Sequence, residues 1–219
     1  MGIPVFILGK SGSGKSASLR NFDPKEVAIF NVASKPLPFK GGAKFTLANG
    51  AGYAAMSKVF GDKKRAEKFK TYVIDDSQYL MAFDSFAKAE MKGYDKFTTM
   101  AVNFYNLLQD IILKLPRDTI VYLLHHVDTD ENGDTKAKTI GKMLDQQLCI
   151  EGLVSIVLMA VITDRGEYKF LTRNNGHNTV KTPMDMFDSE YIDNDLKAVD
   201  TAIREYYGFI KEDNENAEN

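Results

Sequence analysis

The sequence contains a single cysteine, Cys149, and only three histidines among its 219 residues. One cysteine excludes both a disulfide framework and a cysteine-based zinc cluster. The histidines show no spacing with acidic residues that would indicate a dedicated transition-metal site. The composition therefore favours a protein without disulfides and without such a metal site.

Long apolar runs are also missing. No run approaches the roughly 20 residues of a membrane-spanning helix, and the first residues lack the basic-then-apolar pattern of a signal peptide. The net charge of −2 gives no overall preference for nucleic acid or membranes. These absences predict an intracellular protein with no membrane partner, and the length suits one domain with a substantial core.

Charge is nevertheless distributed unevenly. Residues 35–70 include nine basic and two acidic side chains, whereas residues 182–219 include three basic and eleven acidic ones. These segments are either two solvated faces or, for the first, a basic surface that binds a polyanion. We assign residues 1–210 to one domain and residues 211–219 to a disordered acidic tail. The tail solubilises the protein, docks a basic partner or screens a nucleic-acid site from non-specific binding.

Short apolar segments alternate with helical patterns along the chain. This alternation predicts an α/β fold with a mostly parallel central sheet, helices on both faces and a C-terminal edge hairpin. No internal repeat is visible, and residues 35–52 and 127–139 have the composition of irregular loops, the second one mobile. We expect strands at 3–8, 26–32, 71–75, 119–126, 154–162 and 167–172. We expect helices at 15–21, 77–92, 98–115, 140–150 and 196–207, and one or two helices at 54–70.

The stretch GKSGSGKS at residues 9–16 matches the phosphate-loop pattern G-x-x-x-x-G-K-[ST] in one frame. A predicted strand precedes it and a predicted helix follows it, as the motif requires. Glycines allow backbone amides to approach an anion, Lys15 would reach the β- and γ-phosphates, and the Ser16 hydroxyl would hold Mg²⁺. The predicted nucleotide-binding residues are Gly9, Lys10, Ser11, Gly12, Ser13, Gly14, Lys15, Ser16 and Ala17.

Two carboxylates, Asp75 and Asp76, close the predicted third strand. Parallel strands bring their C-terminal ends to one edge of the sheet, so Asp75 should meet the phosphate loop and support Mg²⁺ together with Ser16. Asp76 either orients or deprotonates the attacking water, or caps the helix that follows.

His125 and His126 end the predicted fourth strand at the same edge. One of them should face the γ-phosphate, and His126 is the stronger candidate because it lies further along the strand. The alternative for either residue is a buried, hydrogen-bonded histidine. The predicted catalytic residues are Lys15, Asp76 and His126.

With these motifs in place, the chain resembles the RecA-like P-loop ATPases of bacteriophages, in particular the Sak-type single-strand annealing ATPases. The resemblance is carried by the phosphate loop, by VIDDS at 73–77, by LLHH at 123–126 and by the polar loop after it. Residues 31–42, 141–160 and 178–187 are also similar to segments of that family. The similarity extends over about residues 3–207.

The resemblance implies a RecA-like core that assembles with copies of itself, hydrolyses ATP with Mg²⁺ and acts on single-stranded DNA in phage recombination. It also implies the cytoplasm of an infected bacterium, with a phage single-strand-binding or recombination protein as partner. By resemblance, Lys15, Ser16 and Asp75 bind phosphate and metal. The loop at 127–139 is then either a DNA-contacting loop, through Lys136, Lys138 and the following Lys142, or a solvated surface loop.

One departure from the family affects catalysis. RecA-like recombinases carry a catalytic glutamate after the second strand, and the matching segment here, NVASK, has no acidic residue. Either Asp76 replaces that glutamate or hydrolysis is slow. A cation from a neighbouring subunit would stabilise the transition state, and Arg165, Lys169 and Arg173 are the candidates.

Two other functions remain open at this stage. A small-molecule or nucleotide kinase shares the strand, phosphate loop and helix, but the six arginines are scattered and form no lid-like cluster. A nucleotide-gated binding protein with little turnover would explain the missing glutamate. No guanine-selecting N/T-K-x-D segment is present, which agrees with adenine preference.

Overall fold

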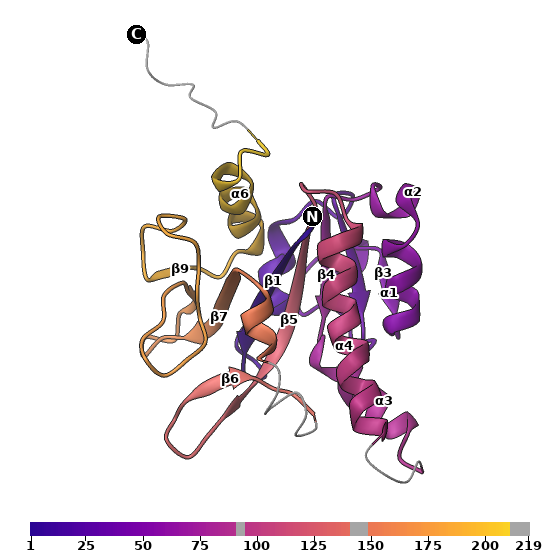
Figure 1. The fold of residues 1–219 in the computed structure, drawn as a ribbon. Helices are drawn as coiled ribbons and strands as arrows, with labels where there is room; N and C mark the ends of the chain where they lie inside the picture. Colours follow the sequence, from indigo (N-terminus) through magenta and orange to yellow (C-terminus); the bar gives the residue numbers. More distant parts are fainter. Residues whose placement is uncertain (91–94, 141–148, 211–219) are drawn as a thin grey trace.

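Side chains on the central strands alternate between two separate cores. On β1 (Ile3–Gly9), Phe6 and Leu8 join one buried cluster, whereas Val5 and Ile7 join the other. Successive side chains of a strand point to opposite faces, so a sheet of such strands must be covered on both faces. The computed structural model describes residues 1–90, 95–140 and 149–210, and Figure 1 shows the sheet with helices around it.

The sheet has nine strands, in the order β3–β2–β4–β5–β1–β7–β8–β9, with β6 paired to the far end of β5. The strands from β3 to β7 in this order run parallel to one another. β8 pairs antiparallel with both of its neighbours, β7 and β9. β5 therefore lies between the strand that precedes the glycine-rich loop and the strand that carries Asp75. The other strands are β2 (Val27–Asn31), β3 (Leu47–Asn49), β4 (Thr71–Asp75), β5 (Ile120–Thr129), β6 (Thr135–Ala137), β7 (Ile156–Ile162), β8 (Tyr168–Leu171) and β9 (Tyr191–Asp193).

The helices divide between the two faces. Buried side chains of α1, α3 and α4 join the cluster that contains Phe6, and those of η1 and α6 join the cluster that contains Val5. None of the helices in the described residues is long and apolar enough to cross a membrane. The helices are η1 (Ser16–Asn21), η2 (Gly42–Lys44), α1 (Tyr53–Phe60), α2 (Lys63–Ala66), α3 (Gln78–Ala87), α4 (Asp95–Lys114), η3 (Ile150–Leu153) and α6 (Leu196–Tyr206).

A buried ion pair fastens α6 to the sheet. The Asp200 carboxylate accepts hydrogen bonds from the Tyr122 hydroxyl on β5 and from Arg204 Nε, the latter at 2.6 Å. The Arg204 guanidinium also donates to the carbonyl oxygens of Lys70 and Asp118, just before β4 and β5 begin. The ends of these strands remote from the glycine-rich loop are therefore clamped by one side chain.

The α/β class and the mostly parallel sheet with helices on both faces are confirmed, and β4 has the predicted bounds. Two details differ. The segment at 35–52 was predicted to be irregular but contains η2 and β3. The predicted edge hairpin of β7 and β8 is not at the edge, because β9 pairs with β8. Both added strands have three residues, too few for a periodic pattern to reveal.

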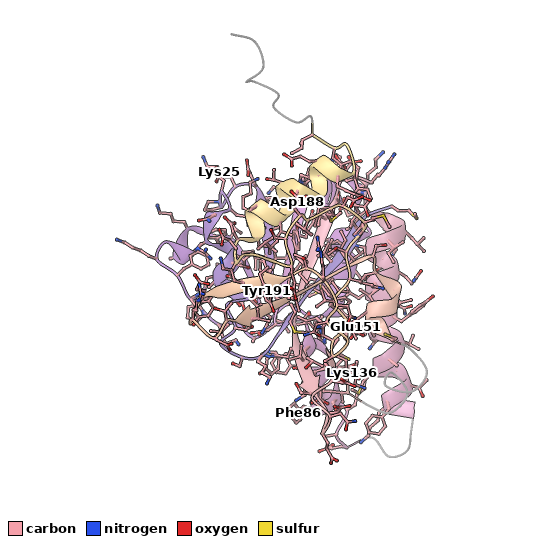
Figure 2. All side chains as sticks on the ribbon, turned by 90° about the vertical axis from the view of Figure 1, so that its left-hand side faces the viewer. Lys25, Phe86, Lys136, Glu151, Asp188 and Tyr191 are labelled. Carbon is pink, nitrogen blue, oxygen red and sulfur yellow. The ribbon has the colours of Figure 1, made fainter. Side chains whose placement is uncertain are left out.

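The polar segment at 127–139 is a hairpin rather than an irregular loop. β5 continues to Thr129 and pairs with β6 across a turn. The buried carboxylate of Glu151 holds this hairpin by accepting a hydrogen bond from the Ala137 amide at 2.7 Å, and Figure 2 shows Glu151 near Lys136 of β6. Most of the predicted helix at 140–150 and the predicted tail at 211–219 lie outside the described residues.

Candidate functional site

The glycine-rich loop after β1 requires glycine at two positions. Gly12 (φ +80°) and Gly14 (φ +92°) have a left-handed backbone conformation, which costs other L-residues about 1–2 kcal/mol. At Gly14 a side chain would also collide, because a Cβ atom there would lie 2.9 Å from Cδ1 of Tyr168. The loop therefore lies directly against β8.

The predicted helix after the loop is present as a 3-10 helix. η1 has six residues, and no side chain caps its first turn. Phe22, in an extended conformation, ends it two residues before Pro24. A 3-10 helix this short has only a small helix dipole, so anion binding would depend on the loop amides and on Lys15.

Lys15 is held inside the loop and is only 6% exposed. Its ammonium donates hydrogen bonds to the carbonyl oxygens of Gly9, at 2.8 Å, and Lys10, at 2.9 Å. Burial lowers the pKa of Lys15 to about 8, although the carboxylates of Asp76 and Asp75 oppose this shift. The nearby carbonyl and carboxylate oxygens offset only part of the cost of burying this charge, so an anionic ligand would stabilise it further.

Ser16 and Asp75 meet although β5 separates their strands. The Ser16 hydroxyl donates to Asp75 Oδ1 at 2.7 Å. Burial raises the pKa of the Asp75 carboxyl, and the hydrogen bond from Ser16 opposes that rise. A hydroxyl and a carboxylate in contact are suitable oxygen ligands for Mg²⁺, which takes few protein ligands and completes its shell with phosphates and water. No group of three or more His, Cys, Asp or Glu side chains in the described parts of the chain could hold a metal ion.

Asp76 has the unusual backbone φ of +60° and accepts contacts on both carboxylate oxygens. Oδ2 lies 2.5 Å from the Lys35 ammonium, and Oδ1 lies 3.3 Å from His126 Nε2. Burial would raise the pKa of Asp76, but the hydrogen bonds from His126 and Lys35 outweigh it and lower the pKa. A carboxylate stabilised in this way is a weak base while both contacts last.

The two histidines have different surroundings. His126 lines the pocket beside the loop and packs edge-on against the Tyr79 ring. His125 is fully buried, with Nδ1 2.8 Å from the Ser77 hydroxyl and Nε2 2.8 Å from the Lys138 carbonyl oxygen. A carbonyl can only accept, so Nε2 carries a proton. Burial also lowers the pKa of His125 to about 4, so the ring is neutral near pH 7 and His125 is a structural residue.

These side chains surround a pocket of about 360 Å³ at the C-terminal edge of the sheet. The loop forms one wall, and residues that follow β2 and β4, together with His126 of β5, form the opposite wall. Tyr168 of β8 borders it on the other side of β1. The lining residues are Ser11, Gly12, Gly14, Lys15, Ser16, Ala17, Lys35, Pro38, Asp76, His126 and Tyr168.

Two buried polar groups beside the loop have no hydrogen-bond partner within the described residues, namely Ser13 Oγ and Asn194 Nδ2. The Asn194 nitrogen would lie 3.2 Å from a Cβ atom on Gly14. Leaving such a group unpaired costs about 1–3 kcal/mol, and a polar ligand is one explanation for tolerating that cost. Neither group lines the pocket, so the groups that fit a phosphate chain with its magnesium ion are Lys15, Ser16 and Asp75.

No protein-family model matches the chain, and a search of curated proteins gave no match. The geometry of the pocket therefore carries the functional argument.

Eight of the predicted site residues line this pocket, namely Ser11, Gly12, Gly14, Lys15, Ser16, Ala17, Asp76 and His126. Asp75 lies behind the lining and contacts it through Ser16. Gly9 and Lys10 contribute carbonyl oxygens to Lys15 rather than lining the pocket, and Ser13 is buried within the loop.

The proposed cationic fingers lie elsewhere. Lys169 pairs with Asp193 at 2.7 Å, and Arg173 donates to the carbonyl oxygens of Phe187 and Asp188. Arg165, in the exposed turn between β7 and β8, forms no hydrogen bond or ion pair with the described residues. Of the three, only Arg165 is available to a second subunit without breaking an existing contact.

Sequence reasoning missed Lys35, Tyr168 and Asn194. Lys35 lies in the segment after β2 where the family resemblance implies a catalytic glutamate. That position alone could have indicated that Lys35 lies at the site. Tyr168 and Asn194 approach the loop only through the antiparallel strands at the end of the sheet, which the sequence pattern did not place.

Proposed function

We propose that this protein binds and hydrolyses ATP and acts on single-stranded DNA in phage recombination, as a self-assembled oligomer of the RecA-like P-loop class. The observation that supports nucleotide binding best is the contact of Ser16 with Asp75 beside the loop-bound Lys15. Residues 59 positions apart form a paired hydroxyl and carboxylate at the loop that matches the phosphate-binding pattern. The class, the DNA and the oligomer come from the resemblance.

In this proposal Ser16 and Asp75 hold Mg²⁺, which neutralises charge on the β- and γ-phosphates when it is bound. Asp76 orients a water molecule and accepts its proton. The water oxygen forms a bond to the γ-phosphorus while the bond from that phosphorus to the bridging oxygen breaks, giving ADP and phosphate. His126, bonded to Asp76, positions the carboxylate.

A second candidate, a nucleotide-gated binding protein with little turnover, is favoured by a different observation. Asp76, the acid that follows Asp75 in the chain, is engaged by both Lys35 and His126. While these contacts persist, Asp76 is a poor acceptor for the proton of water. This candidate predicts tight ATP binding with hydrolysis near the background rate.

For DNA, the proposal relies on the basic segment at 35–70. Lys35, Lys63, Arg65 and Lys70 of this segment pair with carboxylates. The other cations form no ion pair within the described part of the chain and are available to phosphates. They are Lys40, Lys44, Lys58, Lys64 and Lys68.

The decisive experiment measures ATP hydrolysis with and without single-stranded DNA, at two salt concentrations. We expect DNA to stimulate hydrolysis, and added salt to reduce the stimulation because DNA contacts release counterions. Lys15→Ala should abolish ATP binding. Lys25→Ala, which removes an exposed lysine at the periphery of the molecule (Figure 2), should leave it unchanged.

Each alternative predicts a different result. ATP binding without turnover, with or without DNA, would support the second candidate. Transfer of phosphate to an added nucleoside or small molecule would indicate a kinase. If the wild-type protein bound no nucleotide, or if Lys15→Ala bound it equally well, the phosphate-loop assignment would be wrong.

A further inference from the structure

The segment after β2 holds one lysine in a fixed position at the pocket. Asn31, at the end of β2, is 1% exposed. Its side chain donates to the Lys35 carbonyl oxygen at 2.7 Å and accepts from the Lys35 amide at 3.2 Å. Pro36 follows directly and restricts the backbone of Lys35 to extended conformations. The backbone of Lys35 is thus anchored on both sides, whereas its side chain is 57% exposed and free to change partner.

The backbone is strained on both sides of the Lys35–Asp76 pair. Ser34 has a φ of +55° and Asp76 a φ of +60°, a conformation that is uncommon outside glycine and is found preferentially at functional sites. Only three residues other than glycine have a positive φ in the described ranges, and the third is Asp185. Ser34, directly before Lys35, and Asp76 itself are thus two of these three residues, and both belong to the segments that form the Lys35–Asp76 ion pair.

Lys35 and Lys15 face the same pocket from opposite walls. Both line it, and besides burial the charge of Lys35 contributes to the lowered pKa of Lys15. Lys15 is held by carbonyl oxygens of Gly9 and Lys10, whereas the Lys35 ammonium pairs with Asp76 and lies 5.6 Å from the centre of the Tyr79 ring. The second cation thus stands beside Asp76 and His126, on the side of the pocket where the terminal phosphate would lie in the proposed function.

We propose that Lys35 is the residue with which this pocket distinguishes a nucleoside triphosphate from a diphosphate, by leaving Asp76 to bind the terminal phosphate. The inference rests on the proposed nucleotide binding and extends it to a residue on a different segment. A diphosphate has no group at that end of the pocket, so Lys35 stays on Asp76. A triphosphate presents a dianionic group that competes with a single carboxylate for the ammonium. Release of Asp76 then follows from binding of the triphosphate itself.

The test compares the dissociation constants of ATP and ADP by calorimetry, with Mg²⁺ and without DNA. We expect Lys35→Ala to weaken ATP binding about tenfold or more, from the loss of a charge-assisted contact, and to leave ADP binding within about twofold. Lys35→Arg keeps the charge and should retain most of the preference. Lys25→Ala is the control for loss of an exposed lysine, and unchanged melting temperatures verify folding.

A double variant separates direct contact from simple neutralisation. If Lys35 only masks the charge of Asp76, then Lys35→Ala weakens ATP binding through repulsion by the exposed carboxylate. Lys35→Ala combined with Asp76→Asn would in that case restore the ATP preference. If Lys35 binds the phosphate, the double variant should keep the loss. Restoration of the preference would overturn the inference.

The failure of this inference differs from the failure of the proposed function. A wild-type protein that binds neither nucleotide would refute nucleotide binding altogether. A wild-type protein that binds both, alongside a Lys35→Ala variant with an unchanged ratio of ATP to ADP affinity, would refute only the role of Lys35.

Discussion

Replacing Gly14 by alanine should destabilise the protein more than the same change at Gly12, although both glycines belong to one loop. Both have a left-handed backbone, at φ +92° and +80°, which costs alanine about 1–2 kcal/mol. At Gly12 nothing lies within 4 Å of the added Cβ atom. At Gly14 the atom would meet Tyr168 at 2.9 Å and the amide group of Asn194 at 3.2 and 3.3 Å.

The magnitude follows from what must move. Tyr168 is half exposed and can rotate, whereas Asn194 is 3% exposed and has little room. Overpacking of this kind costs about 1–3 kcal/mol. We therefore expect a loss of about 1–2 kcal/mol for Gly12→Ala and about 2–5 kcal/mol for Gly14→Ala. Urea unfolding would show the extra loss as a midpoint lower by about 0.5–1.5 M, for an m-value near 2 kcal/mol per M.

A third and a fourth variant test the stated cause. Tyr168→Ala removes the nearest atom, so Gly14→Ala should cost less in that background than in the wild type. If Gly12→Ala and Gly14→Ala cost the same, or if the extra cost persists without the Tyr168 ring, the contact between the loop and β8 does not have the importance argued above.

Four further predictions concern single side chains. Asp75→Asn should leave ATP affinity the same with Mg²⁺ and with EDTA, whereas the wild type should bind more tightly with Mg²⁺; a retained difference would remove Asp75 from the metal site. Asp76→Asn should lower turnover about 100-fold or more, in the range of general-base catalysis, with ATP affinity within about threefold; equal losses in a hydrolysis assay and calorimetry would indicate a structural role. Burial lowers the pKa of His125 to about 4, below that of an unfolded histidine. The unfolded chain therefore binds more protons between pH 4 and 6.5, and the free energy of unfolding falls by about 3 kcal/mol as the pH falls through that range. Urea unfolding of His125→Gln should show a correspondingly weaker pH dependence. Arg204→Met leaves the buried Asp200 carboxylate without its cation and should cost about 3–5 kcal/mol in urea unfolding, whereas a loss under 1 kcal/mol would contradict the clamp on α6.

The main strands could be predicted because they are short apolar runs buried on both faces. The convergence of Lys15, Ser16 and Asp75 followed from the same pattern, since parallel strands share one C-terminal edge. The three-residue strands β3 and β9 could not be predicted, because they are defined by pairing with longer neighbours rather than by periodicity.

The surroundings of Asp76 were hidden for a similar reason. Its partner Lys35 follows a different strand, and the turn that brings them together depends on the hydrogen bonds of Asn31. A sequence pattern records which residues are polar at a strand end, but it does not record how far the next segment folds back over that end. Tyr168 and Asn194 likewise come close to Gly14 through the folding of distant segments, which the sequence pattern does not show.

β5 joins three regions with one continuous backbone. Just before β5 begins, the Asp118 carbonyl accepts a hydrogen bond from Arg204. The middle of β5 is buried between β1 and β4. Its far half carries His126 and then forms the hairpin with β6. The hairpin is itself anchored, through the Ala137 amide to Glu151 and through the Lys138 carbonyl to His125. The backbone that carries His126 is therefore fixed on both sides of the pocket, so His126 can move by side-chain rotation while the strand stays in place.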